Sequence, residues 1–132
     1  MYLLDTNACI HYLKFTDSPI ARKLSIHLPE TVVCSITKSE LFYGAMGSTN
    51  PTQSIRRQQE FLELFVALVF DDEAARICGR IRAQLSTQGK PIGTDDLQIA
   101  AIALGHELTL VTHNIREFSR VEDLKLEDWQ SG

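Results

Sequence analysis

The chain has 132 residues, of which 44% are hydrophobic and 23% charged, as is usual for one compact domain with one core. No apolar run approaches the roughly 20 residues of a membrane helix, and no basic stretch leads into an apolar one, so we expect a cytoplasmic protein with neither membrane span nor signal peptide. The net charge of −4 argues against a broadly basic nucleic-acid binder, so any contact with nucleic acid must use local patches or a metal ion.

The first seven residues, MYLLDTN, lead from apolar side chains directly into polar ones. Tyr2, Leu3 and Leu4 predict a short strand that is buried on both faces, like the strands of parallel sheets. Asp5 follows at the carboxyl end of this strand, where open α/β sheets bind their ligands. A carboxylate is costly to bury there unless something pairs with it. A short helix is expected over residues 7–14.

The rest of the first third predicts two more helices with a strand between them. Ser18 and Pro19 are typical of a helix start, and the β-branched run 31–35 predicts the second strand. The helix expected over 36–47 places Glu40 on one face among apolar and small residues. This acid either belongs to a site or is solvated at the border of the apolar stripe.

The middle of the chain continues the alternation. Asn50 is expected to cap a helix over 52–65, and the apolar run 67–70 predicts the third strand. A long helix with a regular apolar stripe is expected over 73–88, and Gly89 ends it.

The last third predicts one more helix, two strands and a helical turn. Thr94 is expected to cap the helix 95–104, and strands are expected at 108–112 and 124–126 with the turn 115–118 between them. Because strands alternate with helices throughout, the pattern predicts a parallel, three-layer α/β/α domain.

The three cysteines, Cys9, Cys34 and Cys78, are far apart in the sequence and form no CxxC pair. The four histidines show no ligand spacing such as HxxxH. We therefore expect buried free thiols rather than a disulfide framework or a zinc site.

Acids recur at comparable places around the predicted sheet. Asp5 ends the first strand, Glu40 lies in the helix after the second, and Asp96 begins the helix before the fourth, next to Asp95. One of these two neighbouring acids is expected to be ordinary helix N-terminal charge. Because the carboxyl ends of parallel strands share one edge, these acids are expected to converge. They would repel each other unless a cation lay between them, and oxygen ligands favour Mg²⁺ or Mn²⁺. Such a site is suited to phosphodiester hydrolysis, although acids at loop ends are also ordinary surface charge.

The sequence resembles the PIN-domain ribonucleases of the VapC toxin type. The resemblance is carried, from end to end and in order, by YLLDTN, SITKSELFYGA, IGTDDLQIAAIAL, LTLVTHNIREFSRV and LKLEDW. It implies a single PIN domain over residues 1–132, a parallel sheet flanked by helices, and an Mg²⁺- or Mn²⁺-dependent endoribonuclease that acts as the toxin of a toxin–antitoxin pair. It also implies a VapB-type antitoxin that blocks the site, and a homodimer.

The resemblance further implies roles for single residues. Asp5, Glu40 and Asp96 match the metal-binding acids, with Asp5 and Asp96 the most direct ligands and Glu40 either a ligand or the group that orients the attacking water. Thr6 and Thr112 match hydroxyl positions that hold the acids.

A fourth acid of many PIN domains is replaced here by the amide of Asn114, for which Glu117 is a candidate substitute. Expected contacts to RNA phosphates are Arg116, His113 and Lys38.

Two other readings keep the sequence pattern but change the function. One is a phosphotransfer protein of similar architecture. Asn7 stands where a haloacid-dehalogenase-like phosphatase needs its second acid, and no lysine follows the strand 108–112 as a receiver domain requires. The other is a non-catalytic module that binds RNA or a partner, against which the presence of all three acids argues.

Overall fold

The computed structural model describes residues 1–131, so that Gly132, the last residue of the expected domain, lies outside the described residues. Five short strands form one sheet in the order β3-β2-β1-β4-β5, and every neighbouring pair is parallel. The strands are β1 (Tyr2–Leu4), β2 (Thr31–Cys34), β3 (Ala67–Leu68), β4 (Thr109–Val111) and β5 (Leu126–Glu127). The central strand is β1, so the residue that follows it lies in the middle of the carboxyl edge.

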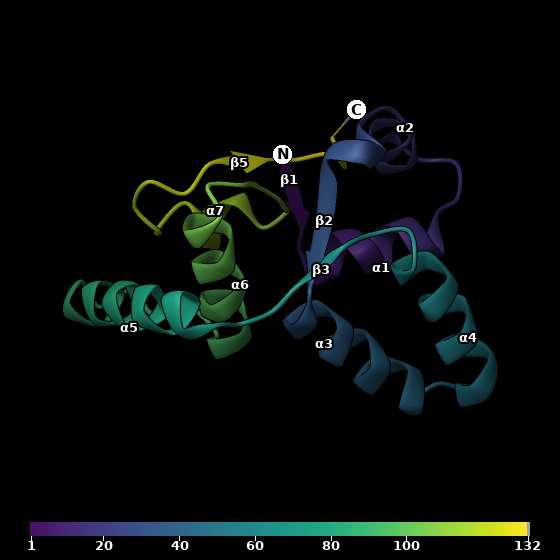
Figure 1. The fold of residues 1–132 in the computed structure, drawn as a ribbon, viewed down its shortest axis with the longest axis horizontal. Helices are drawn as coiled ribbons and strands as arrows, with labels where there is room; N and C mark the ends of the chain where they lie inside the picture. The colour runs from purple at the N-terminus through teal and green to yellow at the C-terminus, as the bar shows by residue number, and fades with distance from the viewer. Residues whose placement is uncertain (132) are drawn as a thin grey trace.

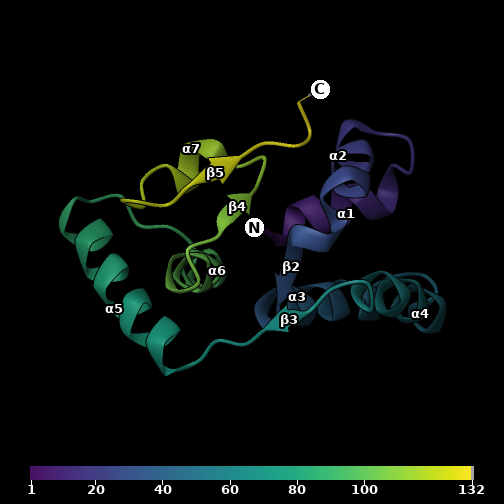
Figure 2. The same ribbon diagram turned by 45° about the horizontal axis from the view of Figure 1, so that its top comes forward.

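The connections between strands are helical. They comprise α1 (Thr6–Lys14), α2 (Pro19–His27), the 3-10 turn η1 (Leu28–Glu30), α3 (Ser35–Met46), α4 (Pro51–Leu62), α5 (Asp72–Thr87), α6 (Thr94–Gly105) and α7 (Ile115–Phe118). Figures 1 and 2 show α1 to α4 grouped on one side of the sheet and α5 to α7 on the other, joined by the extended segment that runs through β3 to α5. No helix within residues 1–131 is long and apolar enough to cross a membrane.

Each strand sends alternate side chains to opposite faces, and both faces are covered. Leu3, Val32 and Leu110 belong to one buried cluster, together with side chains of α5 and α6. Their neighbours in sequence, Leu4, Val33 and Val111, belong to a second cluster with α1, α2 and α4. The expected parallel, three-layer α/β/α domain is therefore confirmed. All three cysteines are free thiols, as predicted, with Cys78 only partly buried.

The element boundaries differ from the prediction mainly in the edge strands. β3 ends at Leu68, not at residue 70, because its only partner strand, β2, ends at Cys34 and the chain then turns into α3. β5 starts at Leu126, not at 124, because Leu124 still belongs to the preceding turn, in which its N–H donates to the Val121 carbonyl and Asp123 has a left-handed backbone (φ 68°). Gly93, not Thr94, is the N-cap of α6, because Thr94 already has helical backbone.

Candidate active site at the carboxyl edge

Asp5 lies where β1 ends and α1 begins. Its side chain caps α1, since the Ala8 N–H donates to Asp5 Oδ1 at 2.8 Å. Only 3% of the residue is exposed. Burial raises the pKa of Asp5 to about 6, with a contribution from the nearby negative charge of Glu40, although hydrogen bonds from Thr112 and Ala8 act in the opposite direction. The carboxylate thus carries an unfavourable charge at neutral pH.

Glu40 reaches the same region from α3. The Thr6 hydroxyl donates to Glu40 Oε1 at 2.5 Å, and the Thr6 and Thr37 hydroxyl oxygens lie 3.2 Å apart. Partial burial raises the pKa of Glu40, and the neighbouring Asp95 raises it further, while the hydrogen bond from Thr6 lowers it. Thr6 therefore fixes one carboxylate oxygen of Glu40 and leaves Oε2 for other partners.

Asp96 lies in the first turn of α6, across the edge from Asp5. Burial raises its pKa to about 6, and the charges of Glu117, Asp5 and Glu40 raise it further. These three acids belong to different parts of the chain, so negative charge gathers at this edge of the sheet only when the chain folds.

The acids share one cleft of about 480 Å³. Its lining residues are Asp5, Thr6, Asn7, Ile10, Ser39, Glu40, Tyr43, Asp95 and Asp96. The ion pairs found within residues 1–131 involve none of its four acids. The cleft therefore holds several carboxylates, none of which forms an ion pair with a basic side chain of residues 1–131.

The donor chemistry of this cleft fits a hard divalent cation. All of its charged groups are carboxylates, and such oxygens are the ligands that Mg²⁺ and Mn²⁺ prefer. As the side chains stand in residues 1–131, no three His, Cys, Asp or Glu groups are close enough to hold one ion together. Mg²⁺ is commonly bound through one or two carboxylates and keeps several waters, so the arrangement is compatible with Asp5 and Asp96 as direct ligands.

The loop after β4 connects the remaining expected residues to the edge. Thr112 Oγ1 accepts from the Asn114 backbone N–H at 2.9 Å, and Asn114 Nδ2 donates to Glu117 Oε2 at 2.9 Å. Glu117 Oε1 also accepts from the Gly93 N–H at 3.4 Å, at the start of the helix that carries Asp96. Asn114 and Glu117 thus form a link between α7 and α6 and are not lining residues of the acidic cleft.

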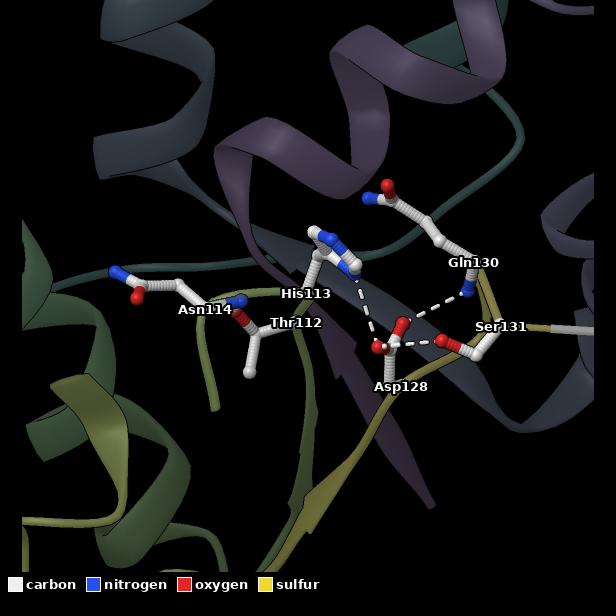
Figure 3. Close-up of polar contacts among 6 residues, drawn as sticks. All are labelled: Thr112, His113, Asn114, Asp128, Gln130 and Ser131. Atoms are coloured by element: carbon white, nitrogen blue, oxygen red, sulfur yellow. Dashed lines mark hydrogen bonds and ion pairs between the residues drawn. The ribbon is translucent and has the colours of Figure 1, made fainter. Parts of the chain in front are cut away.

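The three basic residues expected to contact RNA do not lie together. Figure 3 shows His113 beside Asp128, and its Nδ1 is 2.9 Å from Asp128 Oδ2. Lys38 lines a separate depression between α3 and α4, and Arg116 is exposed on α7. Among them, His113 is the one next to the acidic cleft, as its influence on the pKa of Asp5 indicates.

No role in the site was predicted from the sequence for Asp95 or for Asp128. Asp95 lines the cleft and acts on Glu40, and Asp128 orients His113. Asp95 could have been predicted to lie near the site, because it neighbours Asp96 in the first turn of the same helix. No local pattern connects Asp128 to His113, because the contact forms only when β5 aligns beside β4.

Comparison with known proteins agrees with the fold. The profile of the PIN domain matches residues 2–124. The chain therefore belongs to the PIN-domain family.

Within this family, the full-length relatives are VapC ribonucleases. The chain is 36% identical to the tRNA(fMet)-specific endonuclease VapC of Salmonella typhimurium and 40% identical to ribonuclease VapC2 of Haemophilus influenzae, each over 97% of both chains. Among solved structures, DNA-bound VapBC from Salmonella typhimurium aligns with a TM-score of 0.93 at 36% identity, covering 97% of both chains. VapBC2 from Rickettsia felis bound to a promoter fragment aligns with a TM-score of 0.91 at 32% identity, covering 97% of this chain and 98% of the other. The resemblance to the VapC group is thus confirmed.

Proposed function

We propose that the protein is the endoribonuclease toxin of a VapBC-type pair, with one PIN domain over residues 1–132, and that its active site binds Mg²⁺, or Mn²⁺, through Asp5 and Asp96, with Glu40 beside them. The observation that carries this proposal is the cleft in which these carboxylates lie together without an ion pair to any basic side chain of residues 1–131. When bound, the ion supplies a water of lowered pKa and positive charge against the scissile phosphate.

The residues of the chain divide the remaining work. Asp5, fixed by the Ala8 N–H and by Thr112, and Asp96, at the start of α6, are the direct metal ligands. Glu40 is held through Oε1 by Thr6, so its Oε2 is the atom that accepts a hydrogen bond or proton from the attacking water. Partial burial raises the pKa of Glu40, which makes its carboxylate a better proton acceptor than an exposed glutamate.

The partners follow from the relatives. The solved relatives are toxin–antitoxin complexes, which supports a VapB-type antitoxin as the partner of this chain. A homodimer is supported by exposed apolar side chains on either side of the edge strand β3, at Leu64 and Val66 before it and Val69 after it. Light scattering after size-exclusion chromatography measures this state, and a monomer at micromolar concentration would contradict it.

Cleavage of RNA tests the proposed activity. Because the Salmonella relative is named for tRNA(fMet), this tRNA and total cellular RNA are the substrates. Cleavage should require Mg²⁺ or Mn²⁺ and stop in EDTA. Asp5→Asn and Asp96→Asn should each reduce the rate at least about 100-fold, since each loses a ligand charge while the fold survives. Asp72→Asn, exposed on α5, is the matched control.

Two results would contradict the proposal. Cleavage by Asp96→Asn at the wild-type rate would show that Asp96 is not a ligand of a catalytic metal ion. Retained RNA binding with no cleavage by the wild-type protein would indicate a non-catalytic module, whereas a trapped phosphoenzyme would indicate phosphotransfer.

A further inference from the structure

A second depression lies beside the acidic cleft, on the other side of the same stretch of α1. It has a volume of about 390 Å³ and shares Asn7 and Ile10 with the cleft as a common wall. Its other lining residues are His11, Lys14, Phe15, His113, Asn114 and Gln130; this depression is called the basic hollow below. The two depressions therefore open next to each other at the carboxyl edge.

The charge changes sign across the shared wall. The ionisable side chains of the basic hollow are His11, Lys14 and His113, and no acid is among its lining residues within 1–131. A nucleic-acid strand with one phosphate at the acidic cleft would bring a neighbouring phosphate to Lys14, where a cation attracts it. The acidic cleft by itself would repel such a strand.

The hollow also offers an aromatic surface. Phe15, at the C-terminal end of α1, is 52% exposed although it is a large apolar side chain. Its ring lies 4.7 Å from that of His11, tilted by 45°. Exposed rings beside a cationic groove are the usual platform on which unpaired bases stack.

His113 is held at the border of the hollow by Asp128. Asp128 Oδ1 accepts from the Gln130 N–H at 2.9 Å, and Oδ2 accepts from the Ser131 hydroxyl at 3.1 Å and lies 2.9 Å from His113 Nδ1 (Figure 3). Although partial burial opposes it, these hydrogen bonds lower the pKa of Asp128, so this side chain is a carboxylate and can only accept. His113 Nδ1 must therefore carry the hydrogen, which leaves Nε2 as the ring atom available to a ligand.

We infer that the basic hollow binds one unpaired nucleotide of the RNA next to the scissile phosphate. The base stacks on Phe15 and His11, Lys14 contacts the phosphate, and His113 Nε2 accepts a hydrogen bond from a ribose 2′-hydroxyl. Asp128 is a positioning residue, because it acts only through His113. The inference rests on the proposed ribonuclease function and adds that the protein selects single-stranded RNA at this point.

Binding of a labelled single-stranded RNA of ten mixed nucleotides tests the inference separately from cleavage. All variants are made in the full chain carrying Asp96→Asn, in Mg²⁺, and the dissociation constant is measured by fluorescence anisotropy at several salt concentrations. Phe15→Ala should weaken binding at least about five-fold through the loss of stacking, and Phe15→Trp should retain it. Lys14→Ala should weaken binding and reduce the slope of log Kd against log salt by about 0.7.

The matched controls are Lys23→Ala and Ile26→Ala, which remove the same kinds of exposed side chain from α2 and should leave binding unchanged. Asp128→Asn and His113→Ala should each weaken binding, and the double variant no more than His113→Ala alone, because both act through one ring. An additive double variant would instead indicate a merely structural role for Asp128.

The inference would be overturned if the parent, Phe15→Ala and Lys14→Ala bound the RNA equally well. It would also be overturned if the parent did not bind the RNA, or if double-stranded RNA competed as well as single-stranded RNA. Unchanged RNA binding with weakened antitoxin binding would assign the hollow to the antitoxin and overturn it as well. These outcomes are independent of the cleavage assay. If the wild type cleaved RNA with a metal ion but the hollow variants bound RNA as well as the parent, the proposed function would stand and only the role of the hollow would be wrong.

Discussion

Thr6 is the residue on which the position of Glu40 depends. Only 9% of Thr6 is exposed. Its hydroxyl oxygen lies between Glu40 Oε1, at 2.5 Å, and the Thr37 hydroxyl oxygen, at 3.2 Å. A buried hydroxyl that bonds to a carboxylate both orients that group and lowers its pKa. The neighbouring Asp5 does not depend on Thr6 for its orientation, because its side chain is fixed as the cap of α1.

Replacement of Thr6 by the similarly shaped valine should release Glu40. We expect kcat for RNA cleavage to fall about ten-fold, because Glu40 no longer points Oε2 at the attacking water. The RNA affinity should stay within about two-fold. Thr6→Ser keeps the hydroxyl and should retain most of the activity. A Thr6→Val enzyme with wild-type kcat, measured in single-turnover experiments, would show that Glu40 needs no such support.

At the scale of elements, the sequence predicted what local signals determine. Ser18 and Asn50 cap the helices that follow them, as expected, and Gly89 ends α5 with φ +67°. The ends of β3 and β5 could not be predicted, because a strand extends only as far as its neighbour offers backbone partners.

The candidate site was predictable to a similar degree. Alternation of strands and helices suggested that Asp5, Glu40 and Asp96 share one edge, the family resemblance singled them out, and all three line the cleft. The roles of Asp95 and Asp128 were missed. They depend on how α6 faces α3 and how β5 aligns with β4, which are tertiary relations without a sequence period.

The whole molecule carries the cost of gathering acids at one edge. Asp5 and Asp96 both have a pKa of about 6 against an ordinary value of 3.8. A raised pKa means that the folded state binds the proton more tightly than the unfolded chain. This contribution to stability is fully present below pH 3.8 and is lost as the pH rises through 6. These two groups should therefore make the metal-free fold less stable at pH 7.5 than at pH 5.

Asp5→Asn should remove its share of this pH dependence. In EDTA, the difference in the free energy of unfolding between pH 5 and pH 7.5 should be about 1 kcal/mol smaller in the variant than in the wild type. Urea unfolding followed by circular dichroism measures it, with Asp72→Asn as the control. The same pH dependence in Asp5→Asn and wild type would mean that burial does not perturb this carboxyl.

Calorimetric titration of Mg²⁺ into the metal-free protein tests most directly whether the gathered acids form a metal site. We predict measurable binding by the wild type and by Asp72→Asn, and at least about ten-fold weaker binding by Asp5→Asn and by Asp96→Asn, since each loses a charged ligand. Equal Mg²⁺ affinity in the wild type, Asp5→Asn and Asp96→Asn, or no binding by the wild type, would contradict the account.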